Sequence, residues 1–143
     1  MAQRTAVVKQ VQGITFAAKA DSNHWVTMDG PPEFGGSSAG PRPKEFLLMA
    51  LGGCTGSDVA SMFRKRRTPL AGLQINLTAN VAEEHPQVFT DIHMEYVFYG
   101  DGLNVADIER AIDLSHSKYC SVSAMLKASV KITHSYRIEP TEK

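Results

Sequence analysis

The chain has 143 residues, of which 43% are hydrophobic and 21% are charged, and its formal net charge at pH 7 is zero. A chain of this length and composition can bury a core without disulfide bonds, so we expect a single globular domain over residues 1–143. The neutral charge argues against a nucleic-acid-binding protein. The two cysteines are too few for a disulfide framework, which leaves redox chemistry, metal binding or no chemical role.

The N-terminal sequence leads directly into an alternating segment, without the apolar stretch of a signal peptide. The longest unbroken apolar run of the most apolar helix, residues 46–51, is too short to cross a bilayer. We therefore expect a cytoplasmic protein with no membrane partner.

Three short strands are predicted first, over residues 5–11, 14–18 and 24–28, joined by tight turns as an antiparallel meander. Residues 30–42 are rich in proline and glycine and should hold no regular element. A loop of this length is usually functional or mobile. Two interpretations stay open: a lid that places Phe34 over Cys54, or a mobile connector.

A long helix is predicted over residues 43–67, which begins with Pro43, ends in a cationic run and is stopped by Pro69. Its apolar residues fall on more than one face, which is typical of a buried helix. Gly52, Gly53 and Gly56 each destabilise a helix interior by about 1 kcal/mol relative to alanine. A close neighbour, either a backbone or a ligand, would explain them. Cys54 lies among these glycines, which favours a reactive thiol over a merely structural cysteine.

The apolar residues of the remaining chain follow clear strand and helix patterns. The pattern predicts strands over 73–81 and 88–99, a helix over 105–116 with Asn104 as its N-cap, a short helix over 121–128 and a strand over 130–138. The order is βββ-α-ββ-αα-β, an α+β fold in which an antiparallel sheet packs on a buried helix. Cys120 falls just before the short helix, where the helix N-terminus should stabilise a thiolate.

A metal site is the alternative use of the cysteines. His116 and Cys120 are spaced to share a helix face, and with Cys54 and His134 they would supply four ligands. No closely spaced ligand pair of the zinc-finger type is present in the sequence, so we expect no metal. His134 is more simply explained as a hydrogen-bonded histidine of the core.

Two motifs resemble those of the OsmC family, which includes the osmotically inducible proteins and the organic hydroperoxide resistance proteins. The segment from Pro43 to Cys54 resembles the family's cysteine helix. The segments 118–122 and 132–136 resemble its second-cysteine region, in the form found in the YhfA-like branch. The resemblance covers nearly the whole chain. It implies an OsmC-like fold and an intertwined homodimer, with two long central helices back to back and two active sites at the dimer interface.

The chemistry that the resemblance implies is that of a thiol-dependent organic hydroperoxide reductase in oxidative-stress defence. Cys54 matches the cysteine that a hydroperoxide oxidises to a sulfenic acid, and Cys120 matches the cysteine that resolves it to a disulfide. An external dithiol, of the lipoyl type, would reduce the enzyme, so no cofactor is needed. Our candidates for an apolar substrate pocket are Phe34, Phe46, Met49 and Met125.

Two positions differ from the organic hydroperoxide resistance branch. That branch has a glutamate where this chain has Lys44, and Glu45 follows one residue later. Its activating arginine in the N-terminal strands has no counterpart here, and Arg42 is the candidate to replace it. We therefore take Cys54, Cys120, Glu45 and Arg42 as the candidate catalytic residues. A non-catalytic thiol redox sensor or a small-molecule binding protein on the same scaffold is the alternative function.

Overall fold

The structure is a computed structural model that describes residues 1–141. The chain forms two compact units, Met1–Leu47 and the part from Leu48 onward. That the two act as one domain stays a prediction from chain length.

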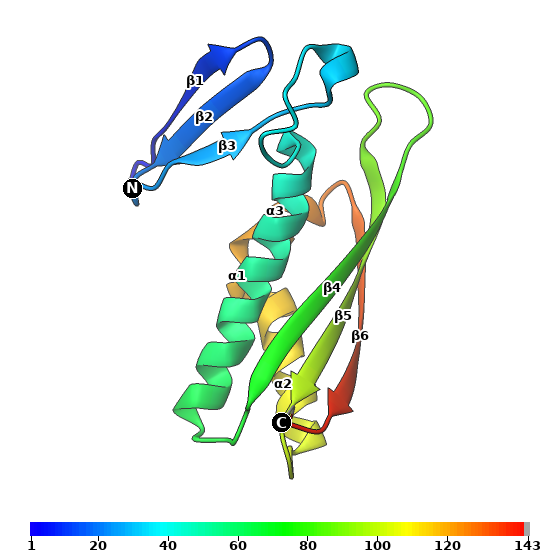
Figure 1. The fold of residues 1–143 in the computed structure, drawn as a ribbon. Coiled ribbons are helices and arrows are strands. Elements are labelled where there is room, and N and C mark those ends of the chain that lie inside the picture. The colour runs from blue at the N-terminus through cyan, green and yellow to red at the C-terminus, as the bar shows by residue number, and fades with distance from the viewer. Residues whose placement is uncertain (142–143) are drawn as a thin grey trace. The chain divides into compact units, whose positions relative to one another are not determined.

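The first unit contains a small antiparallel sheet (Figure 1). Its strands are β1 (Ala6–Gln12), β2 (Thr15–Ala20) and β3 (Val26–Met28), in that order. This confirms the predicted meander. Gly13 makes the β1–β2 turn with a φ of +52°, and a β-carbon there would lie 2.4 Å from the carbonyl oxygen of Gly35. Only glycine fits this turn without strain.

The proline- and glycine-rich segment is folded around one carboxylate, that of Asp29, which is 2% exposed. The carboxylate accepts hydrogen bonds from the Thr15 hydroxyl (2.9 Å) and from the backbone N–H groups of Gly30, Ser37 and Ala39. Burial acts to raise the pKa of Asp29, and these four hydrogen bonds together outweigh it and hold the pKa below its usual value. The segment also contains a short 3-10 helix, η1 (Pro32–Phe34), so the expectation of no regular element was wrong.

These contacts argue against a mobile connector, because the backbone of the loop is tied to a buried side chain. Phe34 is 74% exposed. Its role as the apolar plug of a lid stays a prediction.

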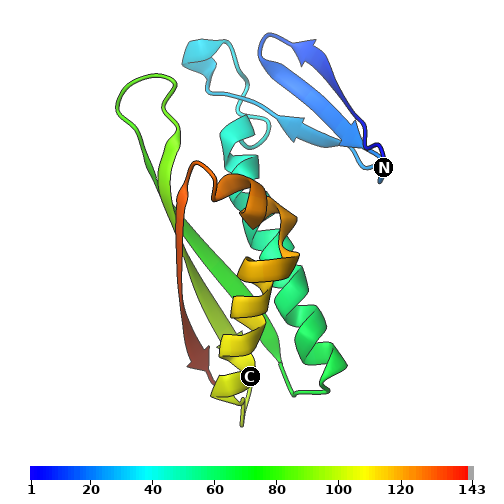
Figure 2. The same cartoon turned by 180° about the vertical axis from the view of Figure 1, so that it is seen from behind.

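The second unit holds a larger sheet with helices packed against one of its faces (Figures 1 and 2). Helix α1 (Pro43–Lys65) starts in the first unit and is followed by β4 (Gly72–Val81), β5 (Phe89–Tyr99) and α2 (Val105–Leu114). A π-helical turn η2 (Ser115–Tyr119), helix α3 (Ser121–Leu126) and strand β6 (Lys131–Glu139) complete the unit. The predicted order of elements and the α+β class are confirmed.

The sheet is not antiparallel throughout. Strand β4 pairs antiparallel with β5, whereas β5 pairs with β6 in parallel. The prediction of a purely antiparallel sheet was wrong because the connection through α2, η2 and α3 carries the chain back along the sheet. Two parallel neighbours need such a crossover, which is usually helical.

Helix α1 buries one stripe within its own chain. Leu51, Thr55, Val59 and Phe63 recur every four residues and are buried. They join the core formed with β5 and α2. Leu47 and Met49 remain 45% and 48% exposed, so the expected burial of the helix on all sides is not met by a single chain. By length and composition alone, α1 is long and apolar enough to cross a membrane, with a mean hydropathy of 1.3. The core helix of a soluble protein can have the same length and composition.

The glycines of α1 have two different surroundings. A β-carbon at Gly52 would lie 2.9 Å from Cδ1 of Leu77, and one at Gly56 would lie 3.1 Å from Cδ1 of Ile75, so both allow β4 to approach the helix. A β-carbon at Gly53 would meet nothing within 4 Å. All three glycines line an apolar groove of about 600 Å³ between α1 and β4.

Candidate active site

The fold brings the two cysteines together. Cys54 lies in α1 and Cys120 in the crossover between β5 and β6, and their Sγ atoms and a carboxylate oxygen of Asp58 all lie within 4.8 Å of one another. Both cysteines are free thiols, joined by a hydrogen bond between their side chains. Cys54 is partly exposed, whereas Cys120 is only 3% exposed. A reagent that arrives from solvent therefore meets Cys54 first.

The π-helical turn places Cys120. Its backbone N–H donates to the carbonyl of Ser115 over 2.8 Å, a bond that spans five residues instead of the four of an α-helix. Cys120 then forms the N-cap of α3, and its Sγ accepts a hydrogen bond of 3.3 Å from the backbone N–H of Ser123. The predicted position at the start of the short helix is confirmed.

The helix N-terminus was expected to stabilise the thiolate of Cys120 and so lower its pKa, but the pKa is raised. Burial, assisted by the hydrogen bond to Cys54, raises the pKa of Cys120 to about 11, and the hydrogen bond from Ser123 only partly opposes this. Cys120 is therefore a neutral thiol at physiological pH. Helix α3 is short, and its few free N–H groups do not compensate for the loss of water around the sulfur.

A chain of hydroxyl groups runs from Asp58 into the core. The Ser115 hydroxyl donates to Oδ2 of Asp58 (2.9 Å) and lies 2.8 Å from the Thr55 hydroxyl, which lies 2.7 Å from the Tyr96 phenol. The phenol oxygen is 2.7 Å from Nε2 of His116. Each hydroxyl has one proton to donate, so the donation from Ser115 to the Asp58 carboxylate fixes the direction of every bond. His116 then carries its proton on Nε2.

Burial sets the ionisation of the inner members of this chain. It raises the pKa of Tyr96 to about 12. It also lowers the pKa of His116 to about 4, with the nearby His134 as the second cause. Both groups are neutral at physiological pH, which agrees with the hydrogen-bond directions derived from the hydroxyls.

His134 is not the core histidine that the sequence suggested. It is exposed on β6, and its ring stacks on that of His116 with centroids 4.9 Å apart. The alternative metal group of Cys54, His116, Cys120 and His134 is not assembled among the described residues. Among residues 1–141, the potential ligand atoms that gather in one place belong to Cys54, Asp58 and Cys120.

Arg42 and Glu45 are engaged with each other at the start of α1. The Glu45 carboxylate accepts a hydrogen bond of 2.9 Å from the backbone N–H of Arg42, and the Glu45 N–H donates to the Arg42 carbonyl. The Arg42 guanidinium donates to the carbonyl of Gly40 over 3.4 Å. These contacts describe a helix cap. A catalytic role for either residue stays a prediction.

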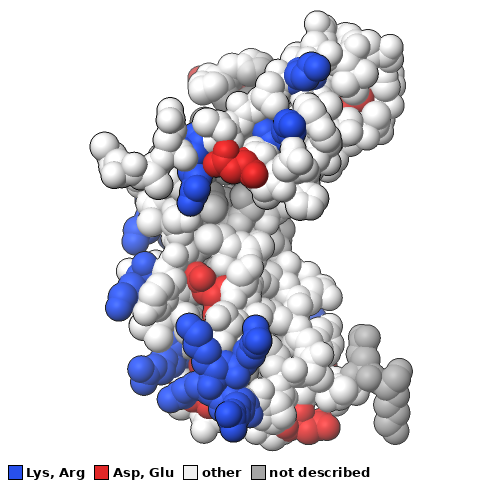
Figure 3. Space-filling view, turned by 90° about the vertical axis from the view of Figure 1, so that its left-hand side faces the viewer, with Lys and Arg blue, Asp and Glu red and all other residues white. Residues whose placement is uncertain are grey.

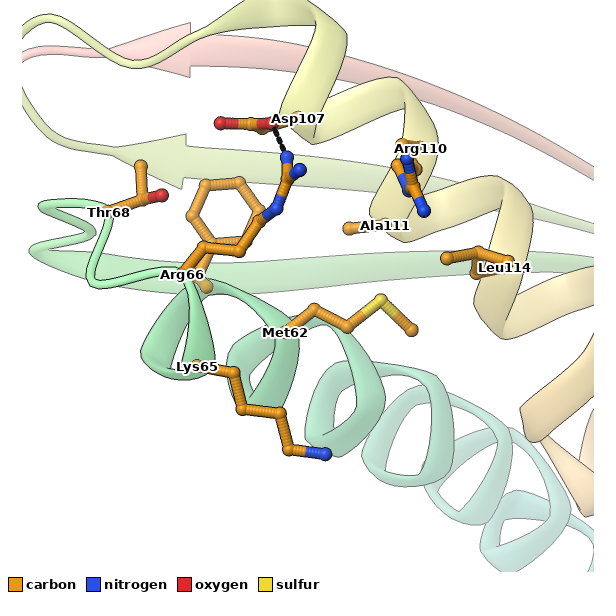
Figure 4. Close-up of a pocket in the computed structure, with 9 residues that line it drawn as sticks. Met62, Lys65, Arg66, Thr68, Asp107, Arg110, Ala111 and Leu114 are labelled. Atoms are coloured by element: carbon orange, nitrogen blue, oxygen red, sulfur yellow. Dashed lines mark hydrogen bonds and ion pairs between the residues drawn. The ribbon is translucent and has the colours of Figure 1, made fainter.

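Two cavities lie between α1 and the α2–η2 segment. One, of about 270 Å³, adjoins the thiols through Asp58 and is also lined by Ser61, Met62, Lys65, Leu114 and Tyr119. The other, of about 180 Å³, is drawn in Figure 4, where Arg66 pairs with Asp107 at one edge and Arg110 lies along α2. Both share Met62, Lys65 and Leu114, so they are neighbours. Of the predicted lining residues, Met49 and Met125 border neither cavity. A lining role for Phe34 and Phe46 stays a prediction.

The charged surface near this region is basic. Figure 3 shows Lys and Arg side chains gathered where α1 ends. The chain there reads Arg64, Lys65, Arg66, Arg67. Cations are favoured at this end of a helix by the helix dipole.

Comparison with known proteins identifies the class. The family model described as OsmC-like protein matches residues 35–135. The chain is 41% identical to Protein YhfA of Escherichia coli (strain K12) over 93% of its own length and 96% of that protein. The chain belongs to the OsmC-like protein family.

Solved structures agree. A hypothetical protein from Aquifex aeolicus VF5 is similar with a TM-score of 0.86 and 30% identity, over 99% of this chain and all (100%) of that one. An organic hydroperoxide resistance protein from Legionella pneumophila has the same fold, with a TM-score of 0.69 and 14% identity, over 95% of this chain and 97% of that one.

Proposed function

We propose that the protein is a thiol-dependent peroxidase that reduces organic hydroperoxides in oxidative-stress defence. The observation that carries the proposal is the approach of the Cys54 and Cys120 sulfurs to within 4.8 Å, although the two cysteines lie far apart in the sequence. Membership of the OsmC family and the shared fold with proteins named for organic hydroperoxide resistance support it.

The exposure of the two sulfurs assigns their roles. The Cys54 sulfur, which is partly exposed, attacks the hydroperoxide, becomes a sulfenic acid and releases the alcohol. The buried Cys120 sulfur then displaces the hydroxyl group as water and forms a disulfide with Cys54. An external dithiol, of the lipoyl type in our proposal, restores both thiols by exchange. The cycle uses sulfur alone, so we propose no metal or organic cofactor.

The cavities beside Asp58 suggest why an organic peroxide would be preferred. Met62 and Leu114 line both cavities, and Phe63 and Ala111 add apolar surface to the second. Burying the apolar part of a substrate against these side chains contributes about 25 cal/mol per Å². Hydrogen peroxide has no such part, so we expect it to be the poorer substrate.

We further propose a cytoplasmic homodimer that associates through the apolar groove of α1. Gly53 lies open in this groove and Met49 is half-exposed beside it. A second α1 helix would cover both. We propose no nucleic-acid or membrane partner.

The test is a thiol count under peroxide. Reduced protein treated with one equivalent of cumene hydroperoxide should lose both of its thiols per chain, without a covalent dimer on a non-reducing gel. Cys120→Ser should lose one thiol and accumulate a sulfenic acid that dimedone traps, whereas Cys54→Ser should not react. Equal reactivity of the two single variants would refute the assigned roles.

A thiol redox sensor is the second candidate function. It is favoured by the contacts of Arg42, the proposed replacement for the activating arginine, because its guanidinium is engaged with the Gly40 carbonyl. Steady-state turnover with dihydrolipoamide separates the two functions. A peroxidase consumes many equivalents of peroxide per chain, whereas a sensor stops after one.

A further inference from the structure

Asp58 has no role in the cycle described so far, yet its carboxylate is part of the thiol cluster. It follows Cys54 by one helical turn of α1, so the two side chains share a face. One carboxylate oxygen lies within 4.8 Å of both sulfurs. The carboxylate also lines the cavity of about 270 Å³, so water can reach it.

The resolving step needs a base near Cys120. Burial keeps Cys120 in its thiol form at neutral pH, and only a thiolate attacks well. The nearby His116 is a poor candidate because both ring nitrogens are engaged, Nε2 with Tyr96 and Nδ1 with Ser123. Asp58 has one oxygen held by Ser115, and its other oxygen has no hydrogen-bond partner among the described residues.

We propose that Asp58 is the general base that takes the proton of Cys120 as this thiol attacks Cys54. The inference rests on the proposed roles of the two cysteines. The S–H bond of Cys120 breaks and its proton passes to the carboxylate, while the Cys120 sulfur supplies the electron pair of the new S–S bond. The S–O bond of the Cys54 sulfenic acid breaks, and the departing hydroxide takes the proton from Asp58 and leaves as water. Atoms and charge balance, and Asp58 returns to its ionised form.

The hydroxyl chain positions this carboxylate. Ser115 donates to Oδ2 of Asp58, and its own oxygen accepts from Thr55, which accepts from Tyr96. Since all donors point the same way, the chain holds Oδ2 of Asp58 and leaves Oδ1 without a hydrogen-bond partner among the described residues. Ser115 and Thr55 are both fully buried at 0% exposure, so they cannot exchange these partners for water.

Reaction with Ellman's reagent tests the base without any peroxide. The Cys54 thiolate first releases one thionitrobenzoate and forms a mixed disulfide. Cys120 then attacks the Cys54 sulfur and releases the second thionitrobenzoate. We expect Asp58→Asn to leave the first phase unchanged and to slow the second on the order of 10²-fold, the usual size of a general-base contribution. Asp58→Glu should recover part of that rate.

The matched control is Asp113→Asn, which removes an exposed carboxylate from α2 and should change neither phase. Ser115→Ala should slow the second phase and Ser115→Thr should restore it; this pair carries the test if Asp58→Asn fails to fold. An unchanged second phase in Asp58→Asn, or no second phase in the wild type, would overturn the inference. If both phases occur as expected and peroxide is not turned over, the peroxidase proposal fails and the role of Asp58 stands.

Discussion

The phenol of Tyr96 on β5 and the imidazole of His116 in the π-helical turn share a hydrogen bond of 2.7 Å inside the core. The same phenol contacts the Thr55 hydroxyl of α1. Tyr96 is 0% exposed and therefore links the sheet to the helix that carries Cys54 and to the turn that precedes Cys120. We therefore expect the stability of the second unit and the proposed chemistry of the thiols to depend on the same few polar groups.

Removal of the Tyr96 hydroxyl should destabilise the fold. Tyr96→Phe removes the donor to the Thr55 hydroxyl and the acceptor of the His116 Nε2–H. An unsatisfied buried group costs about 1–3 kcal/mol. We expect the free energy of unfolding in urea to fall by about this amount. Tyr99→Phe is the control, since Tyr99 is half-buried on the same strand. Equal effects of the two substitutions would show that the hydroxyl chain contributes nothing.

His116 should make stability depend on acid. Its pKa is lowered to about 4 in the folded protein, so the folded state stays neutral while the unfolded state, with a pKa near 6.5, takes up a proton. The unfolded state then binds more protons, and stability is present above pH 6.5 and is lost as the pH falls toward 4. His116→Gln keeps a donor for Tyr96 without this titration. The difference in unfolding free energy between wild type and variant should shrink over that range, and a constant difference would contradict the assignment.

A substitution at Gly53 should test the proposed dimer interface. The alanine methyl group would meet nothing within 4 Å among residues 1–141, and alanine would stabilise an isolated helix by about 1 kcal/mol. If a second α1 packs on this groove, Gly53→Ala should instead weaken association about tenfold or more, measured by sedimentation. Ser61→Ala, on the side of α1 that lines the cavity beside Asp58, is the control. A more stable protein with unchanged association would exclude this groove as the dimer contact.

Glu45 should act on the helix and not on the thiol. It caps α1 through the Arg42 N–H, and along an α-helix it lies about 180° from Cys54 around the axis. Glu45→Gln removes a negative charge from a helix N-terminus, so we expect a loss of about 0.3–1 kcal/mol in unfolding free energy. The rate of Cys54 alkylation by iodoacetamide should stay the same. Complete loss of that reactivity in a folded variant would identify Glu45 as catalytic.

Asp29 should control the loop of the first unit. Its pKa is lowered, so its contribution to stability is present above the ordinary carboxyl pKa and is lost as the pH falls through the folded value. Asp29→Asn should open the segment that follows β3 and speed amide hydrogen exchange at Ser37 and Ala39. Asp21→Asn, an exposed carboxyl in the same unit, should leave both rates unchanged.

The sequence predicted the elements well because alternation and helical spacing are local properties. The bounds of α1, β4 and β5 and the N-cap at Asn104 follow from short windows of residues. The parallel pairing of β6 does not, because it depends on how far the crossover carries the chain. The position of His134 could not be predicted for a similar reason. Apolar and polar residues alternate along its strand, but the alternation does not show that its side chain lies outside the core.

The candidate site was predictable only in its cysteines. Thr55, Tyr96 and Ser115 come from three separate elements, and a polar residue within an apolar pattern gives no sign of its partner. Asp58 could have been predicted from the sequence, since a residue one turn from Cys54 shares its face of the helix. A fixed spacing along one helix is the kind of signal that a sequence retains.

The π-helical turn places Cys120 by the number of residues, not by their side chains. Because the bond from Cys120 to Ser115 takes in one residue more than an α-helical bond, Cys120 points into the core and its neighbour Tyr119 is left 53% exposed. Ser117 and Lys118 are exposed within this turn, so their side chains are free to vary. Loss of either residue would instead shift the register by one position, so that Ser121 would take the place of Cys120 and the thiol would move to the exposed place of Tyr119. The second thiol therefore depends on a length of chain that a point substitution leaves intact and a single-codon deletion destroys.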